Sequence, residues 1–241
     1  MINGYEEFKQ NDNNKWSNIV YHKMNSKNDK EKDTIANTGC GPTSLAIIIS
    51  KLIKEEEIIN SIYEVLIEDI EKYNETVDYD YRINICIPES KIFTPDILVA
   101  MATLTKSKED GIGQGSYDEV FRNIVDRYFY NYLEVVDIEK DNVINRLKDG
   151  DGLIAHSSAV NRGTDKQERS MFASNGHYMT IVGTEEINGE LYVVVNDPYV
   201  EIPKNSNMID KDYLGNGLFR YVALIDPKVG NCDKFWEVKR K

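Results

Sequence analysis

The spacing of apolar side chains is helical in the first part of the chain and strand-like from Leu153 onward. The string TGCGPTS at residues 38–44 is turn-like, and the run that follows it is apolar on every face. Such a run predicts a helix that is buried all round. Because Pro42 is tolerated only in a first turn, we expect this helix to begin at Cys40 or Gly41.

Further helices follow from the same periodicity. Residues 55–73 carry apolar side chains at helical spacing, with acidic residues between them. Residues 94–105 begin with a threonine suited to a helix cap and a proline suited to the first helical position. Residues 117–132 are rich in aromatic side chains, which we expect in the core rather than around a ligand. Residues 141–147 predict a short helix that ends before Gly150.

Short runs of β-branched and apolar residues predict strands near the end of the chain. They cover residues 153–156, 178–184, 191–196 and 219–225. An Asn-Gly pair at residues 188–189 predicts a hairpin between the second and the third of these strands. Because helices come first and strands last, we expect an α+β fold rather than an alternating α/β fold.

The bulk composition is that of one globular domain. The chain has 241 residues, long enough to bury a sizeable core, and a formal net charge of −12. A field of this sign repels phosphate backbones, so nucleic acid is not an expected partner. No apolar run reaches the roughly 18 residues that a membrane helix needs. The polar segment at residues 25–33 is expected to be a surface loop.

The first nine residues carry no signal-peptide pattern. We therefore expect the protein in the cytoplasm, or secreted or at the cell surface if a leader was removed before this numbering begins. The sequence leaves both locations open.

Cys40 is the first candidate for chemistry. The chain has three cysteines, and an odd number at wide spacing predicts neither a disulfide framework nor a zinc site. Cys40 lies between two glycines at the start of the buried helix, where free N–H groups and the helix dipole favour a thiolate. A nucleophile and a small buried cysteine both fit this position.

A nucleophilic cysteine needs a base, and the chain has three histidines. His177 opens a strong strand directly after Asn-Gly, and such a junction presents a side chain rigidly to a cleft. His22 lies near the charged segment, and His156 ends a strand. We therefore expect His177 to be the base, although a structural histidine fits the same position.

Two neighbouring residues could orient His177, and the choice between them depends on the register of the hairpin. Asn196 and Asp197 end the partner strand. A two-residue loop at residues 188–189 places Asn196 on the face of His177, whereas a three-residue loop places Asp197 there. Both turns suit the sequence, so this geometry leaves both residues open.

Three strings resemble the motifs of papain-like peptidases related to the bacteriocin-leader (double-glycine) peptidases. GCGPTS at residues 39–44 resembles the nucleophile motif of that family. FASNGHY at residues 172–178 is similar to its histidine motif, and Asn-Asp-Pro at residues 196–198 is similar to its aspartate motif.

Two further segments extend the resemblance. Gln10, with Asp12 and Trp16 close behind, resembles the upstream glutamine motif of the family. Residues 142–157 resemble the short helix, glycine and strand that precede the histidine motif. The resemblance therefore runs over nearly the whole chain, from about residue 10 to residue 225.

The resemblance implies a papain-like fold, in which a buried nucleophile helix of an N-terminal helical part packs on a C-terminal antiparallel sheet. It implies Cys40 as nucleophile, His177 as base and Asp197 as the orienting acid, with Gln10 in the oxyanion hole. The implied activity is that of a bacterial cysteine peptidase. This enzyme would cleave a peptide or amide bond through a Cys-His-Asp triad and an acyl-enzyme. The implied partner is a peptide or protein substrate, with no metal or cofactor, and we expect a monomer.

The sequence also departs from the family pattern. The spacing from Gln10 to Trp16 is longer than the pattern, and Asn175 stands where glycine is common. We expect one domain over residues 1–241, with an insertion at about 54–92 that shapes specificity. The alternatives to a peptidase are an acyltransferase or amidase on the same site and an inactive peptide-binding module.

Overall fold

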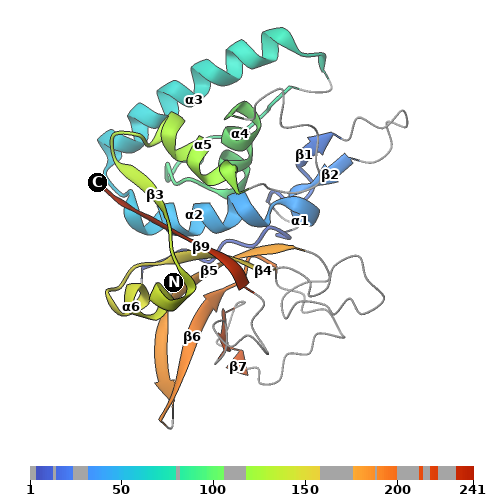
Figure 1. Cartoon of the computed structure of the whole chain (residues 1–241). Coiled ribbons are helices and arrows are strands. Elements are labelled where there is room, and N and C mark those ends of the chain that lie inside the picture. Colours follow the sequence, from blue (N-terminus) through green and yellow to red (C-terminus); the bar gives the residue numbers. More distant parts are fainter. Residues whose placement is uncertain are drawn as a thin grey trace.

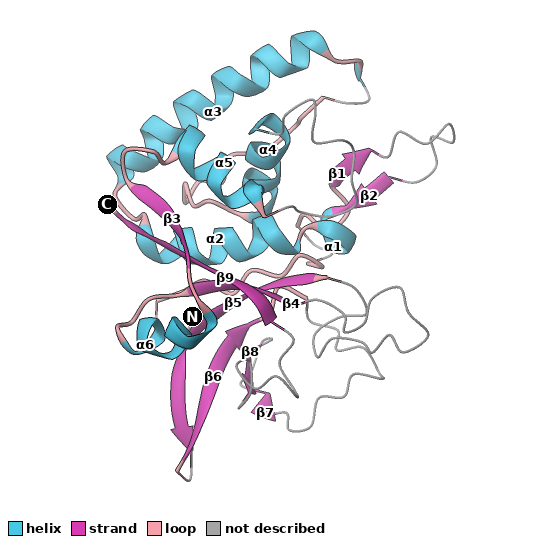
Figure 2. Ribbon diagram, in the orientation of Figure 1, coloured by secondary structure: helices cyan, strands magenta, loops and turns pink. Residues whose placement is uncertain are grey.

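The computed structural model describes residues 4–12, 15–23, 32–79, 82–105, 118–157, 176–187, 189–199, 212–213, 218–221 and 232–241. Within these ranges, most helices gather on one side of an antiparallel sheet (Figure 1, Figure 2). The expected α+β class, with a helical part packed on a C-terminal antiparallel sheet, is confirmed.

The helices follow the predicted order along the chain. They are α1 (Ile35–Thr38), α2 (Cys40–Leu52), α3 (Glu56–Thr76), α4 (Pro95–Thr105), α5 (Glu119–Tyr128), the 3-10 helix η2 (Lys140–Asn142) and α6 (Val143–Lys148). The nucleophile helix α2 begins at Cys40 with Pro42 in its first turn, as predicted. Every residue of α2 from Cys40 to Ile49 is buried, which confirms a helix enclosed on all sides.

The strands form a small hairpin and a larger sheet. The hairpin pairs β1 (Val20–Lys23) with β2 (Lys32–Thr34). The sheet holds β3 (Leu133–Asp137), β4 (Leu153–Ser157), β5 (His177–Ile187), β6 (Glu190–Asn196), β7 (Asp212–Tyr213), β8 (Leu218–Tyr221) and β9 (Cys232–Arg240). Within the described part of the chain their spatial order is β3-β9-β4-β5-β6-β8-β7, and all pairs are antiparallel.

The helix expected at residues 117–132 ends early. α5 ends at Tyr128, because backbone amides of the following residues return to the Phe129 carbonyl and turn the chain into β3. Phe121, Tyr128 and Phe129 lie in the core, as expected for an aromatic stripe. Tyr130 is an exception, with 63% of its surface exposed.

Two predicted boundaries also change. The loop expected at residues 25–33 ends before Lys32, because Lys32–Thr34 forms β2, and residues 25–31 lie outside the described residues. The strand expected at residues 219–225 is described as β8 over Leu218–Tyr221, and its remainder lies outside the described residues.

The sheet carries a hydrophobic core on each face. Residues Ile154, Tyr178, Val182 and Trp236 pack with α2, α3, α4 and α5. The other face packs against α6 through a second cluster, whose members include Leu153, Ala155, Met179, Ile181, Val193, Val195, Phe235, Val143 and Leu147. β5 therefore lies between the two cores and can present successive side chains to either of them.

The β5–β6 hairpin combines a tight loop with a bulge. Ile187 pairs with Glu190, so the loop has two residues, and Gly189 takes a positive φ of 82° as such turns require. The register then shifts by one between Ile181 and Gly183, where β5 carries one residue more than the facing part of β6. Beyond this bulge the pairing is the one that a three-residue loop would have produced.

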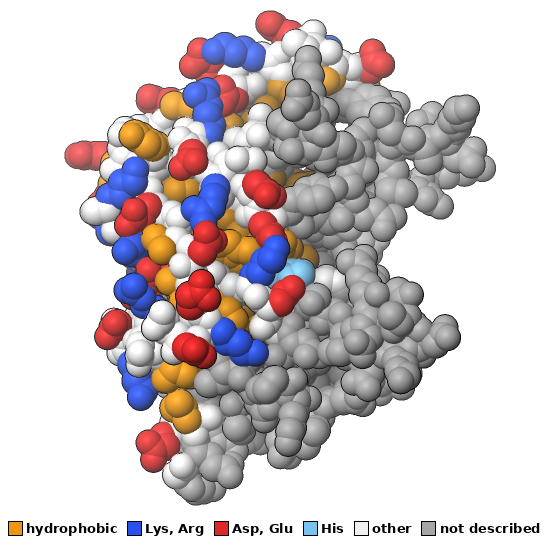
Figure 3. All heavy atoms as spheres, in the orientation of Figure 1, with side chains coloured by type: hydrophobic (Ala, Val, Ile, Leu, Met, Phe, Trp, Pro, Cys, Tyr) orange, Lys and Arg blue, Asp and Glu red, His pale blue; other side chains and the backbone are white. Residues whose placement is uncertain are grey.

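Charged side chains of both signs alternate over the described part of the surface seen in Figure 3. Among the described residues, no helix is both long enough and apolar enough to cross a membrane.

Candidate active site

Cys40 is the first residue of α2, and the start of this helix is fixed by a close approach. A Cβ atom on Gly39 would lie 2.6 Å from the Ile35 carbonyl oxygen, so only glycine fits between α1 and α2. The thiol is buried, with 9% of the residue exposed. At the first position of a buried helix, the free N–H groups and the dipole favour a negative charge.

His177 is the first residue of β5, and only 5% of it is exposed. The Cys40 thiol lies within hydrogen-bonding reach of its ring. The hydroxyl of Thr180 donates to the Ser44 carbonyl (3.1 Å), which ties β5 to the first turns of α2 in the buried interior. This bond keeps the histidine strand in place against the cysteine helix.

Asp197 follows β6 and faces the His177 ring. Its Oδ1 lies 2.8 Å from His177 Nε2 and also accepts the backbone N–H of Tyr199 (2.8 Å). Because Nε2 contacts Asp197, Nδ1 is the ring nitrogen left for Cys40. Of the two orienting residues that the sequence left open, Asp197 makes this contact, because the bulge at Val182 cancels the effect of the two-residue loop.

The surroundings of His177 favour its charged form. Burial lowers the pKa of the imidazole, but the charge and hydrogen bond of Asp197 raise it, and Cys40 adds to the rise. The net result is a pKa raised from 6.5 to about 10. Asp197 and Cys40 together therefore favour the imidazolium form of His177 at neutral pH.

Gln10 contacts α1, the short helix that ends two residues before Cys40. Its backbone N–H donates to the Pro198 carbonyl (2.8 Å), and its side-chain Nε2 donates to the Ala36 carbonyl (2.7 Å). The residue is buried, and its Oε1 has no hydrogen-bond partner among the described residues. One N–H of the amide is used by Ala36, which leaves the second for another acceptor.

Lys9 is a site residue that the sequence reasoning missed. Its ammonium donates to the backbone carbonyl of Asp197 (2.7 Å) and to Oδ1 of Asn196 (3.4 Å). Asn196 in turn donates to the Glu6 carbonyl (2.9 Å), and therefore points at the N-terminal segment instead of at His177. A lysine in a polar N-terminal stretch gives no periodic signal, so the sequence alone could not have identified it.

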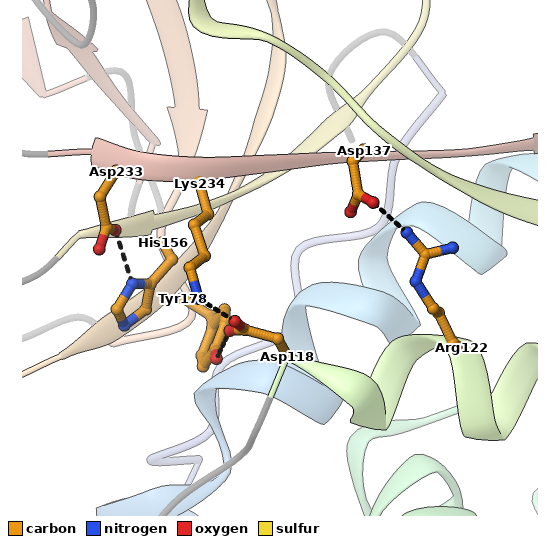
Figure 4. Close-up of polar contacts among 7 residues, drawn as sticks. All are labelled: Asp118, Arg122, Asp137, His156, Tyr178, Asp233 and Lys234. Carbon is orange, nitrogen blue, oxygen red and sulfur yellow. Dashed lines mark hydrogen bonds and ion pairs between the residues drawn. The ribbon is translucent and has the colours of Figure 1, made fainter.

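A second polar cluster includes Tyr178, the residue that follows His177 in β5 (Figure 4). His156 Nδ1 contacts Asp233 Oδ1 (2.7 Å), and Tyr178 donates its hydroxyl to Asp118 (2.9 Å), which also pairs with Lys234. Burial raises the pKa of Tyr178, and the charges of Asp118 and of nearby Cys40 raise it further. The cluster therefore lies within electrostatic range of the thiol.

This cluster borders an open cleft of about 400 Å³ between α5, the end of β3 and the start of β9. Carboxylates predominate in its lining, although Arg122 and Lys234 contribute two cations. The His156 ring packs closely against Gly176, and a Cβ atom at residue 176 would come within 2.8 Å of His156 Nε2.

The other cysteines do not share the environment of Cys40. Cys86 is exposed, while Cys232 is the first residue of β9 and is buried in the core, where burial raises the pKa of its thiol. Among the described residues, no group of three or more His, Cys, Asp or Glu side chains could hold a metal ion. Residues 172–175 of the histidine motif and the side chain of His22 lie outside the description.

A thiol at a helix start, next to a histidine that opens a strand and contacts an acid, is the arrangement used by cysteine hydrolases. The model of the Peptidase_C39 like family matches residues 8–217. The chain therefore belongs to this family, and it is an enzyme of the cysteine peptidase type. No match was found among curated proteins.

Proposed function

We propose that the protein hydrolyses a peptide or amide bond with Cys40 as nucleophile, His177 as general acid and base, and Asp197 as the residue that orients His177. The observation that carries this proposal is the buried chain of contacts from Cys40 through His177 to Asp197. Acyl transfer to water fits these groups without any metal or cofactor.

In the proposed reaction, the Cys40 sulfur attacks the carbonyl carbon of the substrate, while its proton is held by His177. The tetrahedral oxyanion accepts hydrogen bonds from the second N–H of the Gln10 amide and from the backbone N–H of Cys40. The carbon–nitrogen bond then breaks, and His177 gives its proton to the leaving amine. Water, deprotonated by His177, attacks the thioester and releases the acid and the free thiol.

Asp197 supports this cycle by holding one tautomer and one orientation of the imidazole. Its Oδ1 is itself fixed by the backbone N–H of Tyr199, so the acid cannot rotate freely. The bond to Nε2 leaves Nδ1 directed at the sulfur, and the negative charge stabilises the imidazolium that forms.

Substitution of each cysteine tests the proposal. We expect Cys40→Ala to abolish cleavage of a fluorogenic peptide library and to leave the circular dichroism spectrum unchanged. Cys86→Ala is the matched control, because that side chain is exposed and outside the site, and it should cleave like the wild type. Cleavage by Cys40→Ala at the wild-type rate would exclude the proposed nucleophile.

A further inference from the structure

The N-terminal segment at residues 5–10 is fastened to the end of β6 by several bonds. Gln10 donates its backbone N–H to Pro198, and Asn196 donates its side-chain amide to Glu6. Lys9 lies between these two bonds and donates its ammonium to the Asp197 carbonyl. The Lys9 ammonium thus ties the segment that carries Gln10 to the backbone of Asp197, the acid that contacts His177.

The side chain of Lys9 is partly buried. The indole N–H of Trp16 donates to the Lys9 carbonyl (2.6 Å), which fixes the backbone of the residue. Asp197 and Glu7 are charged groups near the ammonium among the described residues. Burial of an ammonium carries a desolvation cost that an exposed lysine does not have. We therefore infer that this lysine has a role beyond solubility.

We propose that Lys9 is a positioning residue for the hydrolysis: its ammonium fixes the Asn196–Asp197 backbone against the Gln10 segment. The inference rests on the proposed function of Cys40, His177 and Asp197. A neutral side chain at this position would release the Asp197 carbonyl and loosen the link between the Gln10 segment and the orienting acid, which the Gln10–Pro198 and Asn196–Glu6 bonds would then hold alone.

Lys9 is a second group of the site, besides His177, whose pKa is shifted. Burial lowers the pKa of Lys9 from 10.5 to about 8, although Asp197 and Glu7 oppose the fall. The ammonium is therefore charged well below pH 8, and the clamp weakens as the pH rises through 8, before His177 loses its proton at about 10. A residue that only stabilises the fold would not produce a fall in kcat near pH 8.

The test compares Lys9→Met and Lys9→Arg with the wild type, and Lys15→Met serves as control. Lys15 is a nearby lysine whose side chain is 60% exposed and pairs with Asp12 at the surface. The probe is the best substrate that the wild-type enzyme selects from a fluorogenic peptide library. We measure kcat and KM between pH 6 and 9, together with the rate of Cys40 alkylation by iodoacetamide.

We expect Lys9→Met to lower kcat about ten- to hundredfold at pH 7 with little change in KM, because small displacements of catalytic groups have effects of this size. The wild-type kcat should fall through pH 8, the Lys9→Met profile should be flat there, and Lys9→Arg should recover part of the rate and lose the step. Lys15→Met should match the wild type.

The inference is overturned if the wild-type profile has no step near pH 8, a result that does not depend on whether Lys9→Met folds. It is also overturned if Lys9→Met keeps the wild-type kcat, or loses activity but keeps the wild-type profile. Failure of the proposed function is a different result, namely hydrolysis or iodoacetamide capture that does not depend on Cys40.

Discussion

His177 illustrates how single residues acquire their chemistry here. The ring is buried, which by itself would favour the neutral form, yet Asp197 on one nitrogen and Cys40 on the other favour the imidazolium. The sequence predicted Cys40 and His177 from a helix start and a strand start. Gln10 and Asp197 depended on resemblance to a family, because nothing local in the sequence places a residue beside a distant helix.

The first prediction concerns the titration of His177. Its pKa of about 10 lies above the unfolded value, so the charged ring stabilises the fold fully below pH 6.5 and ceases to do so as pH rises through 10. We expect Asp197→Asn to lower this pKa by more than one unit, since it removes the main source of the rise. Imidazole NMR signals measure it, with His156→Gln to separate the resonances; an unchanged titration in Asp197→Asn would contradict the assignment.

Asp197 also gives a prediction about rate. We expect Asp197→Ala to lower kcat by on the order of 10²–10⁴, as loss of imidazole orientation does in other hydrolases. Asp149→Ala is a matched control, because Asp149 is an exposed residue that follows α6. A kcat in Asp197→Ala within a few fold of the wild type would mean that His177 is held without the acid.

At the scale of elements, the long helices followed their apolar periodicity, whereas strand register could not be predicted. The two-residue loop alone would have turned Asn196 toward His177, but the bulge at Val182 reverses the outcome. Nothing in the alternation of β5 signals the extra residue. The strand β9 was missed because its burial does not alternate: four consecutive residues, Phe235–Val238, are buried between two layers.

The junction between α1 and α2 yields an element-scale prediction. We expect Gly39→Ala to reduce both stability and activity, because the new Cβ would meet the Ile35 carbonyl at 2.6 Å and displace the start of the nucleophile helix. Asn37→Ala is the control, since Asn37 is exposed on the same short helix. Thermal unfolding and library cleavage measure the two effects; equal behaviour of the two variants would show that this approach is not critical.

For the whole molecule, we infer a single domain whose suggested insertion at residues 54–92 is integrated into the core. Helix α3 contributes Ile59, Ile62 and Leu66 to the cluster that also holds α2. The guanidinium of Arg127 in α5 donates two hydrogen bonds (2.9 and 2.7 Å) to the carboxylate of Asp69 in α3. The sequence identified the segment as unusual, but its amphipathic pattern could not reveal which partner its apolar face covers.

Substitutions of two neighbouring residues of α3, Leu66 and Ile67, test whether this helix is part of the core. We expect Leu66→Ala to lower the free energy of unfolding by about 2–5 kcal/mol, because the side chain is fully buried. Ile67→Ala should change it by less than about 0.5 kcal/mol, since Ile67 is 39% exposed. Urea denaturation measures both, and a small loss in Leu66→Ala would indicate that α3 is a detachable insertion.

The central claim is that His177 activates Cys40, and site-resolved alkylation tests it most directly. Wild type and His177→Ala are treated with iodoacetamide at pH 6, and the modification of each cysteine is followed by peptide mapping, with exposed Cys86 as the internal reference. We predict that Cys40 reacts about 10²-fold faster than an ordinary thiol and loses this advantage in His177→Ala. The account would be contradicted if Cys40 reacted no faster than Cys86, or if its rate were the same without His177.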